Sequence, residues 1–176
     1  MQNLNANEHR IVLHGHANHF NDTDRVGGNF NEKNYGIGYE YTSYDGIDND
    51  WFIEPVYGLS VNIIQDSYKR IFPFAGIFGE IRTKGFVGVG INISAFVGSK
   101  ELNKTKKNVN YNNTTGKFDF TYENIGTERL PIFGATPGVK IYVGDFSFNY
   151  NYSPEFEGFG IYADGFHYFS LSYKFN

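Results

Sequence analysis

Two histidines near the start of the chain have a spacing that could support chemistry. His14 and His16 are two residues apart, so on a β-strand their side chains point to the same face. An imidazole pair of this kind can transfer protons or bind a metal ion. No third ligand stands at a diagnostic spacing, so the sequence predicts no metal site. Two structural histidines that line a barrel are the alternative interpretation.

A second candidate is Asp66-Ser67, which follows the third expected strand. Both are ordinary turn residues, because their side chains hydrogen-bond to nearby backbone groups. Together with His16, however, they supply a base, a carboxylate and a hydroxyl, which are the components of acyl transfer. Neighbouring strand residues point to opposite faces, so the spacing alone does not show a linear Ser–His–Asp relay.

The elements that must position these residues are β-strands. Apolar residues alternate with small or polar ones at a period of two along most of the chain. In the clearest segment, 86–94, valine and isoleucine alternate with glycine, asparagine and serine. The pattern predicts eight strands, at about 9–20, 35–42, 51–65, 70–83, 86–94, 131–144, 146–153 and 167–175.

The connections alternate between short and long. Short turns fall at about 45–50, 83–85 and 144–145, and longer connections at 21–34, 99–130 and 154–165. Outer-membrane barrels have short periplasmic turns and long extracellular loops. The fold class expected is therefore all-β, an eight-stranded antiparallel up-and-down transmembrane β-barrel. It forms one domain over residues 1–176, with a short N-terminal tail at 1–8 and a long extracellular loop at 99–130.

The composition excludes several other classes of protein. The 176 residues include 14 tyrosines, 18 phenylalanines, one tryptophan and 21 glycines but no cysteine, and the net charge is −4. Without a cationic excess, nucleic acid is not an expected partner, and without cysteine no disulfide framework can form. No apolar run reaches the roughly 18 residues that a transmembrane helix needs.

The two faces of each strand indicate which side meets lipid. A small barrel has little room inside, so we expect the glycine, serine and asparagine face to line the lumen. The aromatic and branched face then meets outer-membrane lipid and its interfaces. The polar start of the chain lacks the features of a signal peptide. We therefore expect a mature form, without its signal peptide, in the bacterial outer membrane.

The long segment 99–130 is rich in asparagine, threonine and lysine. A solvated surface loop is one interpretation. The other is a cationic contact for lipopolysaccharide phosphates through Lys104, Lys106 and Lys107, because an ammonium group is a suitable phosphate partner.

Several motifs occur in an order that resembles the lipid A palmitoyltransferase (PagP) family. The first strand and loop carry four of them: His16-Ala17, Phe20-Asn21-Asp22, Thr23-Asp24-Arg25 and Phe30-Asn31-Glu32. A later group consists of Asp66-Ser67-Tyr68, Pro73, Ala75-Gly76 and Gly79. Weaker similarities follow at Gly88-Val89-Gly90, Leu130-Pro131 and Tyr152-Ser153-Pro154.

The resemblance implies an outer-membrane acyltransferase that moves a palmitoyl or similar chain from a glycerophospholipid donor to lipid A as the acceptor. It implies a monomer without a cofactor. His16, with His14 as the fallback, would be the general base, Asp66 would orient it, and Ser67 would bind the ester or oxyanion.

The same resemblance implies a lumenal pocket for the acyl chain. Its substrate-binding residues would be His14, Gly76, Phe78, Gly88 and Gly90. Phe78 stands where the family has the glycine that forms the pocket floor. With Phe78 at the pocket floor we expect a shallower pocket and a shorter acyl chain, whereas a slip of one position would place Gly79 there instead.

Parts of the sequence depart from the family, and other functions stay open. The residues before His9 are too few for the family's N-terminal helix, and Lys33 follows Glu32 where the family has a proline. The main alternative is a non-enzymatic outer-membrane barrel with adhesive or binding loops. A lipid A deacylase would need a histidine where Asn151 stands, and a soluble lipocalin-like carrier would hold its apolar side chains inside.

Overall fold

The computed structural model describes residues 7–19, 30–44, 52–154, 156–158, 161–163 and 165–175. Within them the chain forms ten strands: β1 Glu8–His19, β2 Gly36–Tyr44, β3 Ile53–Gln65, β4 Ile71–Thr83, β5 Val87–Asn112, β6 Lys117–Val143, β7 Phe146–Ser153, β8 Phe156–Gly158, β9 Ile161–Ala163 and β10 Phe166–Lys174. The expected tail at 1–6, the motifs at 20–25 and the turn at 45–50 lie outside the described residues.

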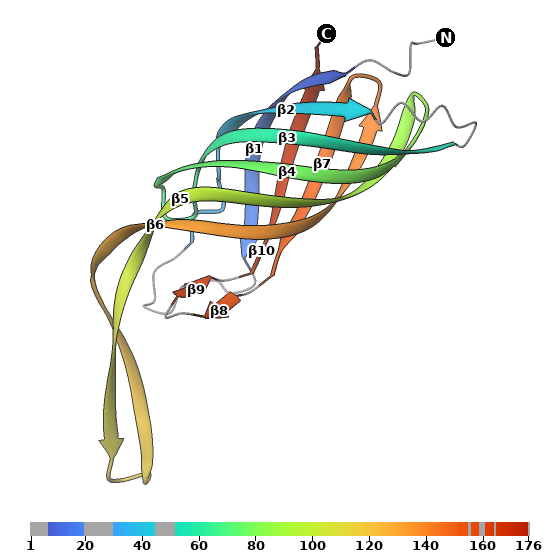
Figure 1. The fold of residues 1–176 in the computed structure, drawn as a ribbon. Helices are drawn as coiled ribbons and strands as arrows, with labels where there is room; N and C mark the ends of the chain where they lie inside the picture. Colours follow the sequence, from blue (N-terminus) through green and yellow to red (C-terminus); the bar gives the residue numbers. More distant parts are fainter. Residues whose placement is uncertain are drawn as a thin grey trace.

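Eight of these strands close into one antiparallel barrel in the order β1-β10-β7-β6-β5-β4-β3-β2. The first and last barrel strands pair directly, with Arg10 opposite Lys174. Both chain ends lie at one end of the barrel, as Figure 1 shows. The predicted fold class, an eight-stranded up-and-down barrel, is confirmed.

Side chains alternate between the two faces as the sequence predicts. On β5, Ile91 and Ile93 are exposed whereas Asn92 between them is buried. On β7, Phe148 is exposed and its neighbour Asn149 is buried. An apolar belt of this size around a closed barrel is suited to lipid and not to water, so the protein is a bacterial outer-membrane barrel. Among the described residues, no helix is long and apolar enough to cross a membrane.

Glycine shapes the barrel at two positions in particular. Gly58 on β3 lies opposite Phe78 on β4, and a Cβ atom on Gly58 would lie 2.1 Å from Phe78 Cζ. The absent side chain is therefore what gives the Phe78 ring its place in the lumen. Gly144, with φ of 59°, lies in the two-residue turn between β6 and β7, where hairpin geometry favours a left-handed residue.

The segment expected as a long loop is instead β-structure. β5 pairs with β4 as far as Gly98, and β6 pairs with β7 only from Gly138 onward. Between these limits the two strands pair only with each other, as far as Asn112 opposite Lys117. They form a two-stranded ribbon, residues 99–131, which projects from the end of the barrel opposite the termini (Figure 1). At about 3.3 Å per residue, the 14 residues of β5 in the ribbon span roughly 45 Å.

Candidate functional site: the lumen, the rim and the β5–β6 ribbon

An ionic network fills the lumen near the chain termini. Glu8 lies 3.2 Å from Arg10 and 3.2 Å from Arg82, and Arg82 donates to Glu54 at 2.8 Å. All four side chains are nearly inaccessible to solvent. Buried charges persist only when they are paired and hydrogen-bonded, so these residues form one cross-braced unit that ties β1, β3 and β4 together.

A second buried ion cluster lies deeper in the lumen. Lys140 Nζ is 3.0 Å from Glu40 and 3.8 Å from Glu80. Tyr142 donates its hydroxyl to Glu80, and the Lys140 ammonium stands 4.7 Å from the centre of the Phe78 ring. Three strands, β2, β4 and β6, are thereby held together across the lumen by charge.

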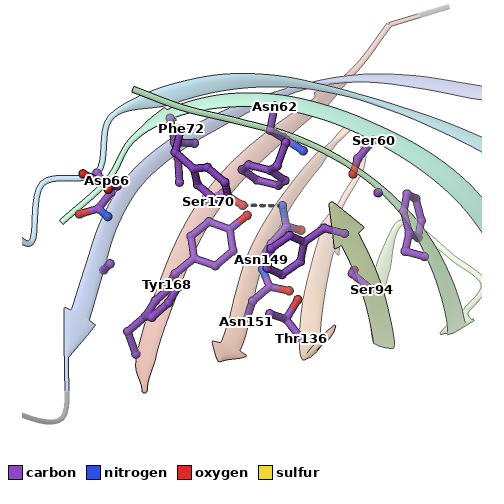
Figure 2. Close-up of a pocket in the computed structure, with 18 of the residues that line it drawn as sticks. Ser60, Asn62, Asp66, Phe72, Ser94, Thr136, Asn149, Asn151, Tyr168 and Ser170 are labelled. Carbon is purple, nitrogen blue, oxygen red and sulfur yellow. Dashed lines mark hydrogen bonds between the residues drawn. The ribbon is translucent and has the colours of Figure 1, made fainter. Parts of the chain in front are cut away.

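A cavity of about 100 Å³ lies between these ions, of which Glu40 and Lys140 line it, and the turn residues Asp66 and Ser67. Four phenyl rings line one side of it, from Phe72, Phe74, Phe78 and Phe96. The rest of the lining mixes apolar side chains such as Ile64 and Phe166 with polar ones. Figure 2 shows Asn149 on β7 donating to Ser170 on the neighbouring strand β10 at 3.1 Å. The cavity therefore has mixed character and a volume of only a few water molecules.

A β-bulge separates the two candidate histidines. His14 pairs with Ser170 but His16 pairs with Phe169, so Gly15 is an extra residue in β1. His14 is buried, and its Nε2 lies 2.9 Å from Asn62 Oδ1. His16 is exposed and contacts the lipid-facing Phe169. The expectation that both imidazoles point to the same face was wrong, because one inserted residue reverses the alternation of the strand.

Asp66 holds a turn. Its Oδ1 accepts hydrogen bonds from the backbone N–H groups of Tyr68 and Arg70, both at 2.9 Å. Its Oδ2 lies 3.9 Å from Lys100 Nζ. The turn contains Lys69 with φ of 63°, a conformation that such side-chain-to-backbone bonds help to fix. The partners of Asp66 are therefore turn amides and a lysine, and His16 is not among them.

Ser67 meets a histidine, but a different one from the one expected. Its hydroxyl lies 2.8 Å from His19 Nε2, and Asn34 donates to it at 3.4 Å. The His19 ring stacks on Phe30 with 4.1 Å between centroids. His16 and Ser67 border the same shallow hollow at the rim. The set of His16, Asp66 and Ser67 is thus not assembled as a relay, and Ser67 joins β1 to the segment before β2.

The predicted substrate-binding residues divide into two groups. Phe78 and Gly76 line the lumenal cavity, and His14 stands beside it with its ring stacked on Tyr168 at 5.5 Å. Gly88 and Gly90 lie lower, where their missing side chains leave room for Thr83 and Glu80. Only the upper group could contact a molecule in the cavity.

The outer half of the ribbon has one apolar and one polar face. Beyond a bulge at Ile125, Val109 pairs with Phe120, and Tyr111 pairs with Phe118. These four side chains share a face and are 53–61% exposed. We call them, together with Tyr122, the aromatic face. The opposite face is polar throughout, and its cross-strand pairs are Lys106 with Glu123, Asn108 with Thr121, Asn110 with Asp119 and Asn112 with Lys117.

The three lysines that were candidates for phosphate contact, Lys104, Lys106 and Lys107, lie beside partners inside the ribbon. Lys104 forms an ion pair with Glu128 at 2.8 Å, and Lys106 is paired in register with Glu123. Lys107 stands 4.1 Å above the Phe120 ring. These contacts favour a role in stabilising the ribbon over contact with phosphate groups.

The sequence pattern did not lead us to expect the aromatic face. Its signal is the alternation of Phe118, Phe120 and Tyr122 with Asp119 and Thr121. The surrounding asparagines, threonines and lysines favour a loop on composition, and this outweighed a period-two pattern only five residues long.

Known proteins resemble this chain in structure only, at low sequence identity. No family model matches the chain, and no curated protein matches it. Three matching solved structures are of Ail, the attachment invasion locus protein of Yersinia pestis. A crystal structure has 9% identity and a TM-score of 0.45, with 96% of this chain and 97% of that one covered. The structure in a phospholipid nanodisc has 11% identity and a TM-score of 0.40, covering 97% and 100%. The structure of Ail in complex with the heparin analogue sucrose octasulfate has 11% identity and a TM-score of 0.40, with 96% of this chain and 97% of that one covered.

The resemblance to the lipid A palmitoyltransferase family is therefore wrong. No family model or curated protein supports it, and these matching structures are of Ail and not of an acyltransferase. The geometry is consistent with this correction, because the bulge at Gly15 turns His16 away from the lumen. The expected transfer of a chain from a glycerophospholipid to lipid A is wrong with it.

Proposed function

We propose that this protein is a non-enzymatic outer-membrane barrel that binds partners through its β5–β6 ribbon. The observation that supports the proposal most strongly is the aromatic face, which stands far outside the lipid-facing belt and is covered by no other described part of the chain. Exposed apolar patches away from lipid mark interaction sites.

The position of the ribbon fits this role. In outer-membrane barrels the long connections face the outside of the cell, and short turns face the periplasm. The ribbon projects from the end opposite the chain termini (Figure 1). A rigid two-stranded element can present side chains beyond the membrane surface with less loss of conformational entropy than a flexible loop.

The polar band at the base of the ribbon separates the two apolar regions. Between Val97 on the barrel and Val109 on the outer ribbon, the lipid-facing side of β5 carries Ser99, Glu101, Asn103, Thr105 and Lys107. The aromatic face is therefore not a continuation of the lipid belt. It is a separate apolar surface held out in water, and binding would remove it from water.

The test replaces one face of the ribbon at a time. The triple variant Val109→Ser, Phe118→Ser and Phe120→Ser removes three of the five side chains of the aromatic face. The matched control changes the polar face at Asn108→Ser, Asn110→Ser and Thr121→Ser. Bacteria that display each variant are measured for attachment to cultured epithelial cells and, separately, to a layer of the same bacteria.

We expect the aromatic-face variant to lose attachment roughly tenfold or more, because truncating buried aromatic anchors costs about 2 kcal/mol each at an interface. The polar-face control is expected to stay near the unmodified protein. If both triple variants attach to both surfaces as well as the unmodified protein does, the ribbon is not the binding surface.

A further inference from the structure

The outer part of β6 has an open edge. Residues 117–137 of β6 pair only with β5 among the described residues, and β7 joins at Gly138. In a two-stranded antiparallel pair, every second residue of each strand points its N–H and C=O groups away from the partner. Among the described residues no strand pairs with segment 117–123 on the side away from β5, and such an edge is a template for another strand.

Parts of the ribbon carry residues that protect a strand edge. The ribbon part of β5 carries Lys100, Lys104, Lys106 and Lys107, and β6 near the barrel carries Pro131 and Pro137. Lysine and proline are the residues that discourage strand addition at edges. The stretch 118–123 contains neither of them.

We propose that segment 117–123 pairs, antiparallel and edge to edge, with the same segment of a second copy of this chain. The proposal rests on the proposed function of the ribbon as a binding surface, and it names the partner. With Phe120 opposite its own copy, Phe118 lies opposite Tyr122, so the two aromatic faces join into one. In the same register Lys117 lies opposite Glu123, once at each end of the shared pair. The sequence Lys-Phe-Asp-Phe-Thr-Tyr-Glu is self-complementary in this arrangement.

The charges select this register over its neighbours. A shift of two residues in one direction brings Asp119 opposite Glu123, and a shift in the other direction brings Asp119 opposite its own copy. Like charges directly opposite each other destabilise a strand pair. A shift by one residue would place the aromatic side chains of the two copies on opposite faces of the sheet.

Antiparallel pairing also determines where the two copies lie. β6 runs from the tip of the ribbon toward the barrel. Two barrels in one membrane project their ribbons to the same side, so their β6 strands run parallel. Two β6 strands that run antiparallel place their barrels at opposite ends. The two copies therefore belong to facing membranes, and the contact is a symmetric one between cells.

The experiment uses the full chain in phosphatidylcholine vesicles, which offer no anionic lipid to the lysines. Clustering of protein-bearing vesicles is followed by light scattering. Three proteins are compared: the unmodified chain, Lys117→Glu and Glu123→Lys. Each substitution alone puts like charges at both ends of the pairing, so each is expected to reduce clustering roughly tenfold.

Mixing the two variants is the decisive arm. Position 117 of one variant then faces position 123 of the other with opposite charges at both ends, so the mixture is expected to cluster as the unmodified chain does. Restoration would also show that both variants fold. Absence of clustering by the unmodified chain, or clustering by either variant alone at the unmodified level, would overturn the proposal. Clustering with protein-free vesicles would identify a lipid surface as the partner and overturn it as well.

Cysteine mapping tests the register independently, because the chain has no cysteine of its own. Positions 119 and 121 lie opposite each other across the two copies. A mixture of Asp119→Cys and Thr121→Cys chains is expected to form an intermolecular disulfide on mild oxidation, and each variant alone is the control. Equal cross-linking in all three samples would contradict the register. If clustering fails but ribbon-dependent attachment to epithelial cells persists, the self-pairing is wrong and the proposed function stands.

Discussion

The barrel lumen and the ribbon use the same kinds of residue for opposite purposes. In the lumen, Arg82 and Lys140 are buried and each contacts two carboxylates. On the ribbon, Lys104 and Arg129 form ion pairs that are about half exposed. Buried charges are costly to leave unpaired, whereas exposed pairs contribute little. The lumen therefore holds the fold together, and the ribbon is free to vary its contacts with other molecules.

The largest loss of stability is expected from the ionic network in the lumen. We expect Arg82→Ala to lower the free energy of unfolding by about 3–5 kcal/mol, because Glu8 and Glu54 would be left as buried carboxylates without their shared partner. Urea unfolding in detergent micelles, followed by circular dichroism, measures the change.

The matched control is Arg129→Ala on the ribbon. Its 3.8 Å contact with Glu101 is solvent-exposed, so the expected change is within about 0.5 kcal/mol. A similar loss at both positions would contradict the contrast between lumen and ribbon.

Packing around Phe78 gives the next effect in size. A methyl group on Gly58 would meet the Phe78 ring, so Gly58→Ala should destabilise the barrel by about 1–3 kcal/mol. Gly79→Ala on the neighbouring strand is the control, because a Cβ atom there has no other atom within 4 Å. Urea unfolding measures both variants. An unchanged free energy of unfolding for Gly58→Ala would show that the Phe78 ring can move aside.

The two candidate histidines give a contrast of similar size. His14→Ala leaves the buried Asn62 amide oxygen without its imidazole partner, and a loss of about 1–3 kcal/mol is expected. His16→Ala, on the outer face, is expected to change the free energy of unfolding by less than about 0.5 kcal/mol. Thermal unfolding of the two variants side by side measures the difference, and a larger loss for His16→Ala than for His14→Ala would contradict the placement of His14 in the lumen and His16 on the outer face.

The alternation of residues was sufficient to predict the barrel from sequence. In β5 and β7, one face is apolar and the other is small and polar, and a small lumen leaves only one way to orient them. The rim could not be predicted in the same way. A glycine such as Gly15 fits a regular strand as well as a bulge, so the reversal between His14 and His16 left no mark in the pattern.

The contacts of Ser67 are a second feature that could not be predicted from the sequence. His19 reaches Ser67 from 48 residues away in the sequence, and the direction of its side chain depends on the same bulge. The ribbon shows a third limit, because its pairing beyond Gly98 depends on long-range register between β5 and β6 and not on local composition. Both features follow from tertiary pairing, which a single sequence does not encode locally.

The most direct measurement compares loss of the ribbon with loss of the rim hydroxyl. Deleting Thr105–Asn124 leaves Lys104, Ile125 and Gly126 as a three-residue loop between Asn103 and Thr127, which are paired in the native ribbon, and such loops with a glycine close hairpins well. Ser67→Ala leaves the ribbon complete. In one attachment assay with bacteria that display each variant, we predict that the shortened ribbon abolishes attachment and that Ser67→Ala preserves it. Attachment that survives the deletion but is lost with Ser67→Ala would contradict the assignment of binding to the ribbon.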